Sequence, residues 1–189
     1  MPDMILKARP ALDGYSESFD GVELHEAVGL AIVSMALPLG NEDAAKKAIK
    51  AAYAADLPAV GKSVLSKDKM VRLAMLGQDQ AFAIFKHDGP DARSLVAGKI
   101  RDAAYTTDQT DVWVGLVISG PRARAALERI CPLDLDPGIF ATNDVARTNM
   151  EHLGTLIVRV CEDTFLMMSA SSSAGSFLHA VETSIRNVS

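Results

Sequence analysis

The chain has 189 residues, of which 49% are hydrophobic and 23% are charged, and its formal net charge is −5. This balance excludes a disordered or low-complexity chain, and the length suffices for a core that needs no disulfide or metal. The acidic charge, together with only six Phe, three Tyr and one Trp, argues against a nucleic-acid-binding protein.

No membrane segment is expected. The longest apolar stretch, residues 27–39, is shorter than the roughly 20 residues that a spanning helix needs. The N-terminus lacks the basic-then-apolar layout of a signal peptide. Cys131 and Cys161 show no C-x-x-C spacing, which favours two free thiols and a cytoplasmic protein.

The first half predicts a strand, a helix, a hairpin and a second helix. Residues 1–20 are polar and interrupted by Pro10 and Gly14, and they predict an extended N-terminal arm. The apolar run over residues 30–37 is typical of a strand covered on both faces. A helix over residues 44–55 follows, with Asn41 as its N-cap. The inward positions expected for this helix are Ala45, Ile49, Ala52 and Tyr53.

A hairpin comes next in this half. Its strands cover residues 70–76 and 81–85, and residues 77–80 form the turn. The helix that follows is predicted over residues 92–103, with Leu95, Val96 and Ile100 buried.

The second half repeats this order. A strand over residues 112–118 leads through Ser119-Gly120-Pro121 into a helix over residues 122–130, with Pro121 near its start. A loop, a hairpin over residues 156–160 and 165–168, and a last helix over residues 173–186 complete it. The inward positions expected for the two helices are Ala125, Leu127, Ile130, Phe177, Val181 and Ile185.

The two halves therefore match in pattern at an offset of about 82 residues. They predict an α+β fold of two similar strand–helix–hairpin–helix halves, duplicated, with mainly antiparallel sheets and packed helices. The expected division is an arm over residues 1–20 and a single unit over residues 21–189, made of halves at about 21–106 and 107–189. Chance recurrence of a common local order is the alternative.

Motifs that resemble catalytic or metal sites are interpreted as structural. Gly61-Lys62-Ser63 looks like the end of a phosphate loop, but Asp56 stands where that loop needs glycine. Ser66 and Lys69 fit a serine–lysine spacing within a charged loop. The four histidines lie in four different segments without metal-ligand spacing; they are His25, His87, His152 and His179.

Two polar loops are weighed in the same way. Asp134 and Asp136 are a pair that acid–base chemistry can use, yet between two prolines they favour turn capping. The serines over residues 169–173 favour a strand-to-helix connection over a ligand site. Spacing alone thus gives no self-contained catalytic centre, which favours a binding or assembly role.

Several segments resemble, in order, the gamma subunit of heterotetrameric sarcosine oxidase. Residues 76–80 are similar to its Leu-Gly-Pro-Asp-Glu turn, and residues 117–124 to its strand, Ser-Gly-Pro turn and helix. Residues 131–135, followed by Phe140 and residues 145–148, resemble its most distinctive stretch. The motif positions, taken as possible partner contacts, are Gly77, Asp79, Gly120, Pro121, Pro132, Asp134, Leu135, Phe140 and Thr148.

The resemblance implies a fold similar to the folate-binding domain of glycine-cleavage T-proteins. It implies a non-catalytic subunit with no cofactor of its own, beside alpha, beta and delta subunits that hold FAD, FMN, NAD, tetrahydrofolate and zinc. The complex would convert sarcosine to glycine, with peroxide and a folate-carried one-carbon unit. The arm and the loop over residues 131–148 are the partner contacts expected.

Three other functions stay open. Gln78, Gln80 and Ala81 replace the Pro, Glu and Trp of the family's turn, and residues 169–173 lack its usual Arg, so the complex could act on another N-methylated amine. The chain could also be a stand-alone binder of folate or a small acid. A scaffold for an unrelated enzyme is the remaining alternative.

Overall fold

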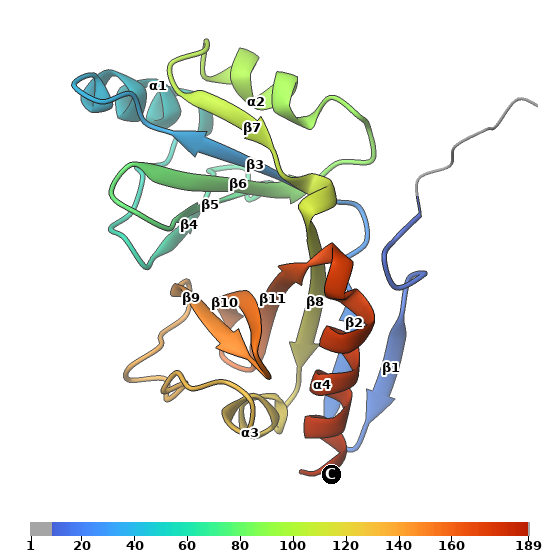
Figure 1. Cartoon of the computed structure of the whole chain (residues 1–189). Helices are drawn as coiled ribbons and strands as arrows, with labels where there is room; N and C mark the ends of the chain where they lie inside the picture. Colours follow the sequence, from blue (N-terminus) through green and yellow to red (C-terminus); the bar gives the residue numbers. More distant parts are fainter. Residues whose placement is uncertain (1–8, 189) are drawn as a thin grey trace, which may run out of the picture.

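The computed structural model describes residues 9–188 as two antiparallel sheets with four α-helices (Figure 1). The six-stranded sheet has the order β1 (Ser16–Phe19), β2 (Val22–Glu26), β8 (Trp113–Ser119), β11 (Thr164–Ala170), β10 (Leu153–Cys161) and β9 (Val145–Met150). The five-stranded sheet has the order β4 (Ser63–Leu65), β5 (Val71–Met75), β6 (Gln80–Lys86), β3 (Leu30–Ala36) and β7 (Tyr105–Asp108).

The helices cover the outer faces of the two sheets (Figure 1). They are α1 (Glu42–Tyr53) and α2 (Ala92–Lys99) on the five-stranded sheet, and α3 (Ala123–Glu128) and α4 (Ala174–Arg186) on the six-stranded sheet. Two 3-10 turns, η1 (Thr110–Val112) and η2 (Ser171–Ser173), lie at strand ends. None of the helices in residues 9–188 has the length and apolar character that crossing a bilayer requires.

A third core lies between the two sheets. Along β3, Ala31 and Val33 pack toward α1 and α2, whereas Ile32 faces the other sheet. Along β11, Phe165 packs toward the helices and Leu166 faces inward. Strands covered on both faces must be apolar at both parities, which explains the continuous apolar runs in the sequence.

The internal repeat is present in the structure. The strands β2, β3, β4, β5 and β6 begin at residues 22, 30, 63, 71 and 80, and β7, β8, β9, β10 and β11 begin at residues 105, 113, 145, 153 and 164, a spacing of 82 to 84. The two sheets share one strand order, because β4-β5-β6-β3-β7 matches β9-β10-β11-β8-β2. The predicted α+β fold of two similar halves is thus confirmed.

Each half contributes its first strand, which we call its leading strand, to the sheet of the other half. β2 comes directly before β3 in the chain, yet it pairs with β8, with Leu24 opposite Ile118. β7 comes before β8, yet it pairs with β3, with Ser34 opposite Thr107. Through these two pairings, each half completes the sheet of the other. The boundary expected between residues 106 and 107 falls inside β7.

The sequence analysis missed five short strands. Residues 16–19, expected within an extended arm, form β1, and residues 145–148, expected in a loop, belong to β9. β2, β4 and β7 were also not predicted. These strands have only three to six residues, expose much of their length and pair with partners that the local sequence does not reveal.

The helices differ from the predictions at their ends. α2 stops at Lys99, because Arg101 and Asp102 adopt positive φ angles of 52° and 53°. Leu95, which was predicted to be buried, is 47% exposed because it lies on the outer face of the helix. α3 begins at Ala123, after Pro121, and turns Ala126 inward in place of Ala125.

Other helix predictions fare better. Asn41 precedes α1 as expected but makes no capping hydrogen bond through its side chain. The buried positions Ala45, Ile49 and Tyr53 of α1 are confirmed, and so are Phe177, Val181 and Ile185 of α4.

Gly120 joins two turns at close range. Its φ is +113°, and a Cβ placed there would lie 2.5 Å from the carbonyl oxygen of Gly21. The same oxygen accepts a hydrogen bond of 3.1 Å from the Arg122 amide. Only glycine fits here, because both the backbone conformation and the space exclude a side chain.

Gly120→Ala is therefore expected to lower the free energy of unfolding by about 2–4 kcal/mol, since it adds both strain and a clash. Urea denaturation measures this loss. Gly175→Ala in α4 is the matched control, because nothing lies within 4 Å of the added methyl and alanine favours helix by roughly 1 kcal/mol. Equal stabilities for both variants would contradict the close-approach argument.

Candidate functional site

A cleft of about 770 Å³ opens beside the two connections, from β2 to β3 and from β7 to β8, through which the chain passes from one sheet to the other. Its walls come from the connection between β2 and β3, the connection between β6 and α2, and η1 with the start of β8. These segments meet on the right of the molecule in Figure 1. The volume is in the range of small-molecule pockets.

Trp113 forms part of the inner wall. Its ring packs edge-on against Phe82 of the other sheet, with centroids 6.0 Å apart. The indole Nε1 is buried and, in residues 9–188, is the only buried side-chain nitrogen or oxygen without a hydrogen-bond partner. An indole N–H can only donate, and leaving it unpaired costs about 1–3 kcal/mol. Trp113 thus lines the cleft and keeps an unpaired, buried N–H.

Carboxylates line the rest of the cleft. Asp88, Asp108 and Asp111 all contribute to its surface. One oxygen of Asp108 accepts the Thr110 amide at 2.9 Å, which shapes η1. His87 Nε2 lies 2.8 Å from Asp91 Oδ1. The cleft surface therefore carries several carboxylates together with the cationic Arg9.

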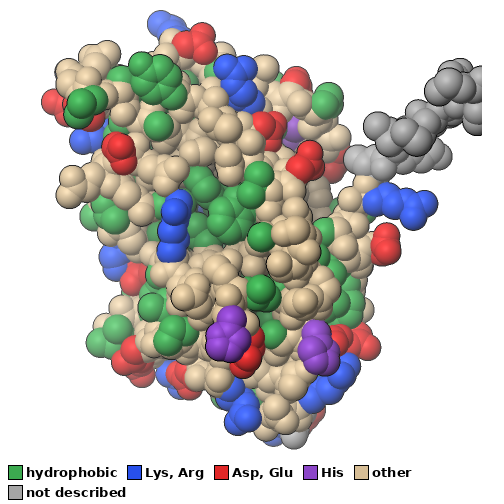
Figure 2. Space-filling view, in the orientation of Figure 1, with side chains coloured by type: hydrophobic (Ala, Val, Ile, Leu, Met, Phe, Trp, Pro, Cys, Tyr) green, Lys and Arg blue, Asp and Glu red, His purple; other side chains and the backbone are tan. Residues whose placement is uncertain are grey.

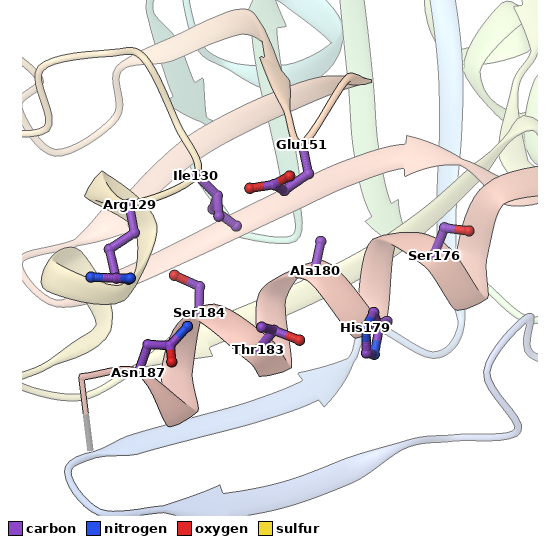
Figure 3. Close-up of a pocket in the computed structure, with 9 residues that line it drawn as sticks. All are labelled: Arg129, Ile130, Glu151, Ser176, His179, Ala180, Thr183, Ser184 and Asn187. Carbon is purple, nitrogen blue, oxygen red and sulfur yellow. The ribbon is translucent and has the colours of Figure 1, made fainter.

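A second, smaller groove of about 380 Å³ runs between α3 and α4 (Figure 3). Ile130 and Ala180 lie at its centre, and Glu151 reaches it from the turn between β9 and β10. The Ser184 hydroxyl points toward α3 and donates to the Ala126 carbonyl at 2.6 Å. The groove therefore lies along the line where α3 and α4 pack against each other.

The motif positions taken from the sequence lie in three separate places. Gly77 and Asp79 form the turn between β5 and β6, where the Asp79 carbonyl accepts the Leu37 amide at 2.8 Å. Gly120 and Pro121 form the turn into α3. The remaining positions belong to the loop after α3 or to β9; they are Pro132, Asp134, Leu135, Phe140 and Thr148.

The loop positions divide between core and surface. Leu135 is fully buried and Phe140 is 8% exposed, both in the core under α3 and α4. Asp134 Oδ1 accepts the Asp136 amide, and Asp136 Oδ1 accepts the Gly138 amide, so the turn-capping interpretation is confirmed. Ile139 is 67% exposed at the tip.

Arg159 holds this loop from beneath, a role that the sequence analysis missed. The side chain is only 2% exposed, and its Nη1 donates to the carbonyls of Leu135 at 3.2 Å and Phe140 at 2.7 Å. Its Nε and Nη2 donate to the carbonyl of Glu162. An arginine within the apolar run over residues 156–160 was the signal, because a buried guanidinium needs several acceptors.

The Gly61-Lys62-Ser63 segment joins the two sheets at their other margin. Lys62 pairs with Asp144 in an isolated bridge, and its Nζ lies 2.6 Å from Asp144 Oδ1. Arg72 donates to Ser63 Oγ and Asn143 Oδ1, both at 2.8 Å, and burial lowers its pKa. The segment therefore links the two halves by hydrogen bonds and an ion pair.

The cysteines and histidines form no metal centre in residues 9–188, where no three metal-ligating side chains come together. Cys161 is exposed and Cys131 is buried, both as free thiols. Burial raises the pKa of the Cys131 thiol, and hydrogen bonds with the Leu133 backbone and the Thr148 side chain oppose this shift.

Arg159→Met is expected to lower the free energy of unfolding by about 2–4 kcal/mol, because the carbonyls of Leu135 and Phe140 lose their donor inside the core. Limited proteolysis should then cut the loop over residues 131–144. Arg147→Met is the control, since its bond to Gln80 is exposed and worth less than about 1 kcal/mol. An intact loop in Arg159→Met would contradict the assigned role.

The comparisons with known proteins agree with the resemblance seen in the sequence. No family model matches the chain. It is 27% identical over 121 residues to the sarcosine oxidase subunit gamma of Arthrobacter sp., a match covering 64% of this chain and 60% of the relative. It is 28% identical over 104 residues to that of Corynebacterium sp. strain P-1, covering 55% and 51%. The chain thus spans about half to three fifths of the length of these relatives.

Solved structures share the fold. A chain of the heterotetrameric sarcosine oxidase from Corynebacterium sp. U-96 matches with a TM-score of 0.76 at 22% identity, over 88% of this chain and 84% of that one. The glycine cleavage system aminomethyltransferase T from Bartonella henselae matches with a TM-score of 0.62 at 15% identity, over 85% and 45%. The chain is similar to sarcosine oxidase gamma subunits, and its fold is similar to that of part of this aminomethyltransferase T.

Proposed function

We propose that this chain is the gamma-type subunit of a cytoplasmic, flavin-dependent sarcosine oxidase, and that it supports the complex without catalytic residues of its own. The observation that carries the proposal is its sequence similarity to two sarcosine oxidase gamma subunits. The fold that it shares with a chain of a heterotetrameric enzyme supports assembly with other subunits.

The positions that carry the resemblance support a scaffold role. Gly120 allows two turns to touch, and Asp134 caps a turn. Leu135 and Phe140 fill the core and present their carbonyls to Arg159. Each of these residues fixes the shape of the chain, which is what an assembly subunit requires.

In this proposal, the redox chemistry takes place in partner subunits. Two electrons pass from the N-methyl group of sarcosine to a flavin and then to oxygen, which becomes peroxide, while the one-carbon unit passes to tetrahydrofolate. Alpha, beta and delta subunits hold FAD, FMN, NAD, folate and zinc. Another N-methylated amine as substrate would leave the role of this chain unchanged.

The loop that follows α3 is the partner contact that the structure supports best. Arg159 fixes the loop before any partner binds, and the Ile139 side chain stands 67% exposed at its tip. A rigid loop loses little conformational entropy on binding, and an exposed apolar side chain on it can act as an anchor. The segment before β2 is the second contact proposed.

Co-expression with the three partner subunits tests this proposal. We expect a complex with sarcosine-dependent peroxide formation, and Ile139→Asp should reduce co-purification by about tenfold or more because it buries a charge at the contact. Leu39→Asp is the control, since Leu39 is 97% exposed in the connection between β3 and α1 on the other sheet. Bound flavin or oxidase turnover in the isolated chain would contradict the proposal, as would unchanged co-purification of Ile139→Asp.

The cleft favours a second candidate function, binding of folate or a small acid. Trp113 lines the cleft and its N–H lacks a hydrogen-bond partner, and the 770 Å³ volume suits a ligand of this size. The nearby aspartates would accept hydrogen bonds from the amino groups of a pterin.

Calorimetric titration with tetrahydrofolate separates the two functions. Binding by the isolated chain predicts a one-to-one isotherm in the micromolar range, and Trp113→Phe should weaken it by about tenfold because it removes the donor. Absence of heat in the unmodified chain would dismiss this second function and leave the subunit proposal intact.

A further inference from the structure

The chain before β1 forms part of the wall of the Trp113 cleft. Arg9, Pro10 and Ala11 contribute to the same cleft surface as Trp113. The chain then turns through Asp13 and Gly14, whose φ angles are +53° and +76°, and reaches Tyr15 at the start of β1. We call residues 9–15 the strap. Its first part therefore lines the same cleft as Trp113.

One buried carboxylate ties the strap to the body of the molecule. Glu26, at the end of β2, is 8% exposed. Its Oε1 accepts the Leu12 amide at 3.0 Å and its Oε2 accepts the Gly14 amide at 2.8 Å. Hydrogen bonds to an ionised acceptor are about twice as strong as neutral ones. Both oxygens of one side chain thus hold two amides of the strap.

The Leu12 side chain also packs against the core beneath α3 and α4, and the remaining contacts of the strap lie within it or at its far end. The hydrogen bonds from Asp13 to Pro10 and from Tyr15 to Leu12 stay within the strap. The Tyr15 hydroxyl lies 2.5 Å from Glu182 Oε1 and 2.7 Å from Glu17 Oε2, and burial with these two carboxylates raises its pKa. Tyr15 is therefore anchored by its hydroxyl and by its carbonyl, which accepts the Glu26 backbone amide at 2.8 Å, and neither contact uses the Glu26 carboxylate.

We propose that the strap is a cover over the Trp113 cleft and that Glu26 is its latch, so that releasing the Leu12 and Gly14 amides opens the cleft. The cover does not depend on which molecule enters, and it holds whether the chain is a subunit or a ligand-binding protein. A partner that binds the strap and moves it would expose the cleft. Access to the cleft would then depend on whether the strap is bound to Glu26 or to the partner.

The single tryptophan makes the cover measurable in the full chain. Acrylamide quenching of Trp113 fluorescence reports how often the quencher reaches the cleft. Glu26→Gln should raise the quenching constant by about twofold or more, because the amide keeps one acceptor oxygen and turns a donor toward the second strap amide. Glu26→Asp keeps the charge but shortens the reach, and should give a smaller rise.

Glu23→Gln is the matched control, because Glu23 lies on the exposed face of the same strand, where it accepts the Ser18 hydroxyl. Its quenching constant should equal that of the unmodified chain. Circular dichroism checks that each variant is folded. If Glu26→Gln does not fold, the quenching constant of Glu26→Asp tests the proposal instead. Unchanged quenching in the folded Glu26 variants, or an equal rise in Glu23→Gln, would overturn the proposal.

Discussion

The exchange of leading strands between the two halves is the constraint on which the rest of the structure depends. β2 completes the sheet built on β8, and β7 completes the sheet built on β3. The core between the sheets then takes Ile32 and Phe82 from one half and Leu156 and Leu166 from the other. Neither half can complete its sheet or cover its inner face alone, so the duplicated chain forms one unit.

This arrangement creates two different margins between the sheets. At one margin, Lys62 and Asp144, which occupy equivalent positions in the two halves, close the gap with an ion pair. Where the leading strands cross, the connections keep the sheets apart and the cleft remains. Figure 2 shows hydrophobic side chains gathered between the upper and lower layers on the face it displays. Space for a ligand therefore arises where the crossing connections interrupt the packing.

The sequence could predict those features that depend on neighbours along the chain. The apolar runs of β3 and β8, the two hairpins and the buried stripe of α4 are all local patterns, and the structure confirms them. β7 and β9 escaped prediction because they are short, partly exposed and paired with distant strands. The cleft escaped because Glu26, Asp88 and Trp113 come from segments that only the strand exchange brings together.

The most direct test of the exchanged, single-unit scaffold is equilibrium unfolding in urea, followed at once by Trp113 fluorescence and by far-ultraviolet circular dichroism. Trp113 lies at the junction of the two sheets, whereas circular dichroism reports the helices and strands of both halves. The account predicts one cooperative transition with the same midpoint for both probes. Two separated transitions, with the junction lost while one half remains folded, would contradict it.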